Sequence, residues 1–323
     1  MLLRLWPEDT HLSFMSMRHI ALVVSVAALI LSAFMLWGRG LNLGIDFAGG
    51  SVIEIERPLD TGADDVRAAL APLGLGDVSV NSARGTGADA VDLVVIRFET
   101  QTPREGEDVE SAQQNANNRV REGLAEAFPG VVIRSSAAVG PKVSGELLRS
   151  GVTALAVALL LMMVYISLRF QWQYAMGAVA ALFHDVIITM GVFALTGFEF
   201  NLATIAALLT IVGYSMNDTV VVFDRVREEA RKYKKMELFK VVDLAINATM
   251  SRTLLTSSTT LLALVSIFVF GGPVLRGMSF ALIFGVVIGT YSSIFVASAV
   301  LLLLGIDRGE KPKREVEGFQ GVS

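Results

Sequence analysis

Residues 211–223 read Ile-Val-Gly-Tyr-Ser-Met-Asn-Asp-Thr-Val-Val-Val-Phe and complete an apolar run that begins at residue 202. A helix needs roughly 20 apolar residues to cross a bilayer, so this run predicts a transmembrane helix. The run nevertheless contains Asp218, and a carboxylate at membrane depth costs about 2.5–3.5 kcal/mol on insertion scales. We therefore expect Asp218 to face a protein interior and to have a function there.

The composition is that of an integral membrane protein. Of the 323 residues, 53% are hydrophobic, and the mean hydropathy is +0.58. The chain has no cysteine and 3 histidines, which argues against disulfides, thiolate metal sites and a histidine metal site. We see no nucleophile with a base. The sequence therefore predicts no enzyme, no metal and no cofactor. An acid at membrane depth indicates proton- or ion-coupled work, for which we expect protons to be the coupling ion.

Further apolar runs are long enough to span about 30 Å of hydrocarbon. The first is long for a signal peptide, and no small-residue cleavage site follows it, so we interpret it as a retained helix. We thus predict an α-helical membrane protein with six transmembrane helices, from the runs 20–37, 152–168, 174–195, 202–223, 253–270 and 278–304.

Basic residues predict the orientation of these helices. They gather in the N-terminal segment 1–19, in the loop 224–251 and in the tail 305–323, whereas the opposite short connections carry only Arg276. Because cytoplasmic loops are rich in lysine and arginine, both termini are predicted to be cytoplasmic. The polar segment 38–150 is then periplasmic, and residues 151–304 carry the remaining helices.

The segment 38–150 has the composition of a soluble domain. Alternating and helical patterns predict the order βαββαβ, which is typical of a ferredoxin-like α+β domain. The predicted elements are a strand over 51–56, a helix over 61–70, strands over 77–82 and 91–98, a helix over 108–128 and a strand over 131–135. The glycine-rich stretch 84–89 lacks the Lys-Ser/Thr ending of a phosphate loop and is interpreted as a hairpin turn. We expect a binding or docking module.

Two glycine-containing motifs join this domain to the membrane helices. The first motif, 44–50, contains Gly44, Asp46, Gly49 and Gly50. The second motif, 139–147, contains Gly140 and Pro141. Glycine permits positive φ angles and close approach of backbones, and Pro141 stiffens the turn after Gly140. These motifs are either simple elbows at the membrane surface or elements that couple the two parts.

Ionisable residues inside the apolar runs are the candidate site. His184 and Asp185 lie near the centre of the run 174–195, and Arg252 stands at the start of the run 253–270. Burial favours a protonated carboxyl group, whereas a nearby guanidinium favours the carboxylate. Changing the distance between Asp218 and Arg252 would therefore bind and release a proton. The alternative is a static ion pair that joins two helices.

Small residues on the same helices are candidates for packing and hydrogen bonding. Gly213 and Asn217 are four residues apart, so the glycine admits a neighbouring helix to which the amide bonds. Gly285, Gly289 and Ser293 also follow four-residue spacing, which predicts a packing face.

Several of these motifs together resemble the SecF members of the SecD/SecF family, within the resistance–nodulation–division superfamily. They are the stretch 44–50, Val-Gly-Pro at 139–141, His-Asp at 184–185, the stretch 214–225, Ser-Arg-Thr-Leu-Leu-Thr-Ser at 251–257 and Gly-Thr-Tyr-Ser-Ser at 289–293. The resemblance covers nearly the whole chain. One departure is Ala48, where family members often carry threonine.

The resemblance implies an auxiliary subunit of the Sec preprotein translocase in the bacterial inner membrane. With SecD, such a subunit uses the proton-motive force to promote export and insertion of polypeptide, and Asp218 and Arg252 match the residues implicated in proton flow. Implied partners are SecD, the SecYEG channel, YajC and YidC, the unfolded polypeptide and the bilayer, with no nucleic acid. The alternatives are a proton-coupled small-molecule exporter of the same superfamily and a purely structural subunit.

Overall fold

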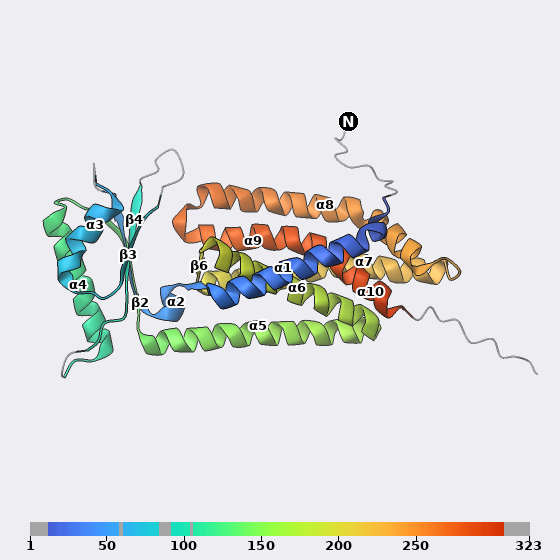
Figure 1. Cartoon of the computed structure of the whole chain (residues 1–323), viewed down its shortest axis with the longest axis horizontal. Helices are drawn as coiled ribbons and strands as arrows, with labels where there is room; N and C mark the ends of the chain where they lie inside the picture. The colour runs from blue at the N-terminus through green and yellow to red at the C-terminus, as the bar shows by residue number, and fades with distance from the viewer. Residues whose placement is uncertain (1–11, 58–60, 84–91, 104–105, 307–323) are drawn as a thin grey trace, which may run out of the picture.

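The computed structural model describes residues 12–57, 61–83, 92–103 and 106–306. A bundle of long helices occupies one end of the molecule and a small sheet domain the other (Figure 1). Within the described residues, 6 helical spans are long and apolar enough to cross a membrane. The hairpin turn predicted over 84–89, the first residues of the N-terminal segment and most of the tail 305–323 lie outside the described residues.

The apolar runs of the sequence form the long helices. The sixth span is interrupted by a π-helical segment, so it has three parts. The helices are α1 (Arg18–Gly38, preceded by the short η1, Phe14–Met17), α5 (Pro141–Arg169), α6 (Trp172–Thr196), α7 (Leu202–Lys232), α8 (Leu238–Phe270) and α9 (Gly272–Ser292), followed by η3 (Ser293–Ala297) and α10 (Ser298–Leu304).

Local signals set several helix ends. Gly197 adopts a φ of 72° and ends α6, and the Asn201 side chain then accepts a hydrogen bond from Thr204 N at 3.1 Å to cap α7. α7 and α8 extend beyond the apolar runs, because the flanking residues are mostly good helix formers such as Arg, Glu, Lys and Ala. The predicted basic loop 224–251 is therefore mostly two helix ends joined by a short turn.

The helices α6, α7 and α9 form the centre of the bundle, whereas α1, α5 and α8 are largely exposed. Aromatic packing at one end of this centre joins α6 to α7. Tyr174 and Phe223 meet edge to face with ring centroids 5.2 Å apart, and both side chains are buried. The polar residues of α6 and α7 are thus held inside the bundle.

The sheet domain has four antiparallel strands and two helices. Strand order in the sheet is β3-β4-β2-β5, and α3 and α4 lie on the face turned away from the bundle (Figure 1). In chain order the elements are β2 (Gly50–Glu56), α3 (Ala63–Leu70), η2 (Ala71–Leu73), β3 (Val78–Ala83), β4 (Leu93–Phe98), α4 (Val109–Ala127) and β5 (Ile133–Val139).

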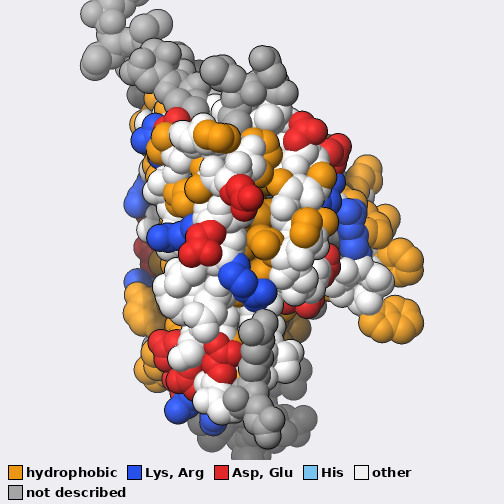
Figure 2. All heavy atoms as spheres, turned by 90° about the vertical axis from the view of Figure 1, so that its left-hand side faces the viewer, with side chains coloured by type: hydrophobic (Ala, Val, Ile, Leu, Met, Phe, Trp, Pro, Cys, Tyr) orange, Lys and Arg blue, Asp and Glu red, His pale blue; other side chains and the backbone are white. Residues whose placement is uncertain are grey.

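Alternation along the strands creates the core of this domain. In β2, Ile53 and Ile55 are fully buried against the helices, while the residues between them are partly exposed. The last strand is longer than the predicted 131–135 and reaches Val139, so it leads directly into α5. Figure 2 shows that acidic, basic and apolar side chains are interspersed on the outer end of the domain.

A second, small sheet ties the two ends of the molecule together. β1 (Asn42–Leu43) follows α1 and pairs in parallel with β6 (Glu199–Phe200), which lies between α6 and α7. The short helix α2 (Ile45–Ala48) comes next and leads to the first strand of the sheet domain. The start of α7 therefore lies beside the path of the chain from membrane to domain.

Candidate functional site

Two of the buried carboxyl groups of the described helices lie within the predicted apolar runs. Asp185 is on α6 and is fully buried, and Asp218 is on α7 with only 3% of its surface exposed. The two differ in their surroundings, because one is fully hydrogen-bonded and the other is not.

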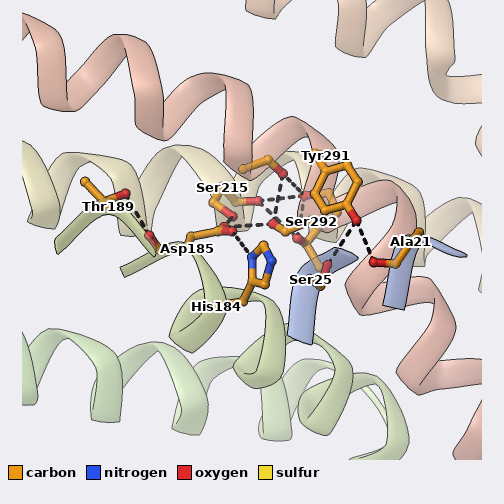
Figure 3. Close-up of polar contacts among 11 residues, drawn as sticks. Ala21, Ser25, His184, Asp185, Thr189, Ser215, Tyr291 and Ser292 are labelled. Carbon is orange, nitrogen blue, oxygen red and sulfur yellow. Dashed lines mark hydrogen bonds and ion pairs between the residues drawn. The ribbon is translucent and has the colours of Figure 1, made fainter. Parts of the chain in front are cut away.

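Asp185 is the acceptor at the centre of a buried hydrogen-bond network (Figure 3). Its Oδ2 accepts from Ser215 Oγ of α7 at 2.6 Å and from Ser292 Oγ of α9 at 2.8 Å. Its Oδ1 lies 3.0 Å from His184 Nδ1. Three helices of the bundle centre therefore meet at one carboxyl group.

His184 extends this network towards α1. Its ring stacks on Tyr291, with centroids 6.1 Å apart, and the tyrosine hydroxyl lies 3.0 Å from Ser25 Oγ and donates to Ala21 O (Figure 3). The second ring nitrogen, His184 Nε2, is buried without a hydrogen-bond partner among the described residues. Such an orphaned atom is a recognised sign of function or of an ordered water.

The π-helical segment η3 begins beside this network. It lets two consecutive serines serve different neighbours: Ser292 donates to Asp185, and the hydroxyl of Ser293 lies 2.8 Å from Thr219 Oγ1 on α7. π-Bulges inside α-helices occur frequently at functional sites. The bulge here marks the polar centre of the bundle.

Asp218 has a different environment. Its Oδ2 is buried and has no hydrogen-bond partner among the described residues. Arg252 on α8 acts on this carboxyl group electrostatically, but no hydrogen bond or ion pair joins these two described side chains. Arg252 and Asn217 are both exposed on the surface of the bundle. The structure thus places Asp218 inside the bundle and Arg252, its candidate partner, on the surface of the bundle.

The predicted packing residues fall into two groups. Gly285 and Gly289 lie against α7, where an added Cβ would collide with Ile211 or come within 3.0 Å of Ser215 Cβ. Ser293 continues the same contact. Gly213 differs, because its added Cβ would meet no atom within 4 Å and the residue is exposed. Among the described residues, Gly213 therefore packs against no other helix, and Asn217 is exposed and forms no side-chain hydrogen bond to another helix.

The first glycine motif is folded tightly beside the start of α7. Gly49 and Gly50 have φ angles of 75° and 108°, a conformation that side chains other than glycine rarely adopt. Asp46 Oδ2 accepts a hydrogen bond from Leu202 N, the first residue of α7, at 2.9 Å. A Cβ added to Gly44 would meet the carboxylate end of Glu199 and lie 3.1 Å from Asn201 Cβ. The motif is thus attached to the helix that carries Asp218.

The second motif and an ion pair complete this junction. Gly140 precedes α5 and Pro141 is its first residue, a position that tolerates the missing N–H of proline. Arg97 of β4 forms an ion pair with Glu199 of β6, which links the sheet domain to the segment before α7. Burial lowers the pKa of Arg97, and the Glu54 carboxylate opposes this shift.

No metal site accompanies these groups in the described part of the chain, where no set of three or more His, Cys, Asp or Glu side chains could hold an ion. The sequence did not identify Ser215, Ser292 or Tyr291 as site residues. Isolated serines in membrane helices usually bond their own backbone, so only the three-dimensional contacts reveal their role.

Comparisons with known proteins agree with this architecture. Residues 119–307 match the family described as "Protein export membrane protein SecD/SecF, C-terminal", and residues 34–56 match the "SecD/SecF GG Motif". The protein translocase subunit SecF of Cereibacter sphaeroides is 46% identical over 319 residues, which cover 98% of this chain and 97% of that protein.

Longer relatives contain the same region as one part. The protein translocase subunit SecDF of Brucella abortus is 39% identical over 305 residues, which cover 94% of this chain and 38% of that protein. The crystal structure of SecDF, a translocon-associated membrane protein from Thermus thermophilus, is similar with a TM-score of 0.81 and 31% identity, covering 93% of this chain and 39% of that one. The chain therefore belongs to the SecD/SecF family of protein-export membrane proteins.

Proposed function

We propose that this chain, an auxiliary subunit of the Sec protein translocase, uses the proton-motive force together with SecD to promote export and membrane insertion of polypeptide. Its relatives are named translocase subunits, which makes it an accessory export protein rather than an enzyme. Partnership with SecD is supported by relatives in which both are one SecDF chain. SecYEG, YajC and YidC complete the proposed set of partners.

The proposed location is the bacterial inner membrane, with both termini in the cytoplasm and residues 38–150 in the periplasm. The basic residues of the turn between α7 and α8 support this orientation. We also assign the sheet domain to the ferredoxin-like class, on the basis of its βαββαβ element order and antiparallel sheet. It would bind the emerging polypeptide or move relative to its partner.

The observation that carries proton coupling is the unpaired, buried carboxyl group of Asp218 beside the charge of Arg252. Burial without hydrogen bonds disfavours the charged form of a carboxyl group, and a nearby cation favours it. A modest movement of the Arg252 guanidinium therefore changes whether the Asp218 carboxyl group is charged or neutral. One proton crossing the membrane field supplies about 2.3 kcal/mol per 100 mV. Exposed polar groups on α7 and α8, including Asn217 and Arg252, are the face we assign to SecD.

The test compares wild type with Asp218→Asn in proteoliposomes that contain this chain, SecD, SecYEG and SecA. Under an imposed proton gradient, we expect wild type to take up protons and to stimulate export, and the variant to lose both while still assembling with SecD. Loss of assembly, or retained stimulation, would instead indicate a purely structural subunit. Unchanged protein export with impaired export of small molecules would indicate a small-molecule exporter.

A further inference from the structure

Another orphaned polar atom lies on α8, the helix that packs against α7 and Asp218. Thr253 follows Arg252 on α8, is 2% exposed, and its Oγ1 is buried without a hydrogen-bond partner among the described residues. Leaving a buried polar group unsatisfied costs about 1–3 kcal/mol, so both this hydroxyl and Asp218 Oδ2 need a partner.

The orientation of the Thr253 hydroxyl is unlike that of its neighbours on α8. Thr249, Thr256 and Thr259 each donate to the carbonyl four residues earlier, at 3.0, 3.1 and 2.9 Å. This is the usual way in which a helical threonine satisfies its hydroxyl in a membrane. Thr253 makes no such bond, although α8 also has a carbonyl group four residues earlier, at Thr249. Its hydroxyl is directed to something other than its own helix.

The register of α7 against α8 places Thr253 at the level of Asp218. One helical turn further from the loop that joins α7 to α8, the Tyr214 hydroxyl donates to Ser257 Oγ at 3.3 Å. Ser257 Oγ in turn lies 2.8 Å from Thr290 Oγ1 on α9. Asp218 follows Tyr214 by four residues, and Thr253 precedes Ser257 by four. Because α7 and α8 are consecutive helices that pack against each other and are joined by a short turn, they run antiparallel, and both steps lead to the same level.

We propose that Thr253 is a positioning residue for Asp218, with a single water bridging its hydroxyl to the Asp218 carboxyl group between α7 and α8. This rests on the proposed function. Among the described residues, Arg252 acts electrostatically on Asp218, and Tyr214 lies one turn away on α7. The bridge satisfies both orphaned atoms at once and gives the proton a fixed path to the carboxyl group.

Infrared difference spectroscopy of the complex with SecD tests this proposal. The C=O stretching band of protonated Asp218 is assigned as the band that disappears in Asp218→Asn. In Thr253→Val, which keeps the shape but removes the hydroxyl, we expect the band to move to higher frequency because the carboxyl group loses a hydrogen bond. Proton-driven export should fall roughly two- to tenfold, the equivalent of one net hydrogen bond.

Two further variants separate positioning from structure. Thr253→Ser retains the hydroxyl and should restore both band and rate. Thr249→Val makes the same change one turn away, where the hydroxyl bonds to its own backbone, and should leave the band in place. An unshifted band in Thr253→Val overturns the role of Thr253 alone. A wild type without any titrating Asp218 band overturns the proton role of Asp218, and this proposal with it.

Discussion

The two buried acids show how environment, more than residue type, determines what a carboxyl group does. Asp185 accepts hydrogen bonds from two serines on other helices, whereas Asp218 Oδ2 has none. A satisfied buried network specifies one arrangement of the helices around it, and an unsatisfied group is poised to change. Asp185 therefore has the contacts of a structural centre, whereas Asp218 has the unpaired environment on which the proposed proton coupling rests.

This contrast predicts unequal effects of the same substitution at the two positions. Asp185→Leu leaves Ser215, Ser292 and His184 without their common partner, so we expect it to lower the free energy of unfolding by about 1–3 kcal/mol. Asp218→Leu removes an acid to which no described protein group donates a hydrogen bond at Oδ2, so it should destabilise the chain less than Asp185→Leu does. Denaturant unfolding of both variants in detergent, followed by circular dichroism, measures the difference. Equal destabilisation by the two would show that Asp185 is no structural centre.

Part of the site could be predicted from the sequence because an ionisable residue in an apolar run is conspicuous in itself. This identified Asp218, His184 and Asp185. The partners of Asp185 could not be predicted, since they lie 30 and 107 positions away and are ordinary serines. Nor does any pattern in the chain reveal that Asp218 and Arg252 fail to form an ion pair.

At the scale of elements, hydropathy predicts where the helices occur but not which face of each helix is buried. The apolar runs predicted six spans, and the structure has them. Their ends were wrong where polar residues continue the helix: α5 begins at Pro141 instead of residue 152, and α7 continues to Lys232. Four-residue glycine spacing also cannot distinguish a face buried in the chain from an exposed one, which is why Gly213 and Gly285 looked alike.

Those two glycines provide a test of helix packing. An alanine at 285 would collide with Ile211 of α7, so we expect Gly285→Ala to destabilise the isolated chain by about 1–3 kcal/mol through overpacking. At the exposed position 213, Gly213→Ala should be neutral or stabilising by up to about 1 kcal/mol through helix propensity. Thermal unfolding in detergent measures both. A destabilised Gly213→Ala would mean that its face is already covered within the chain.

At the scale of the whole molecule, the exposed surface of the bundle is of two kinds. α5 presents large apolar side chains such as Leu161, 62% exposed, which lipid satisfies without help. α7 and α8 expose Asn217, Arg252 and Thr259 in addition to apolar side chains such as Leu262. Polar groups in contact with hydrocarbon are costly, so membrane proteins place them against protein or water. The polar surface, and not the apolar one, therefore needs a partner.

This asymmetry predicts where SecD binds. A photo-crosslinking amino acid at position 217, on α7, should form an adduct with SecD in native membranes, because we assign this face to the partner. The same reagent at position 161, on α5, serves as the matched control and should react with lipid only. Crosslinked products are separated by electrophoresis and identified with antibodies against SecD. Equal adducts from both positions, or an adduct from 161 alone, would place SecD on another face. The charge of Arg252 would then face lipid, and the free-energy cost of a charge at membrane depth argues against that arrangement.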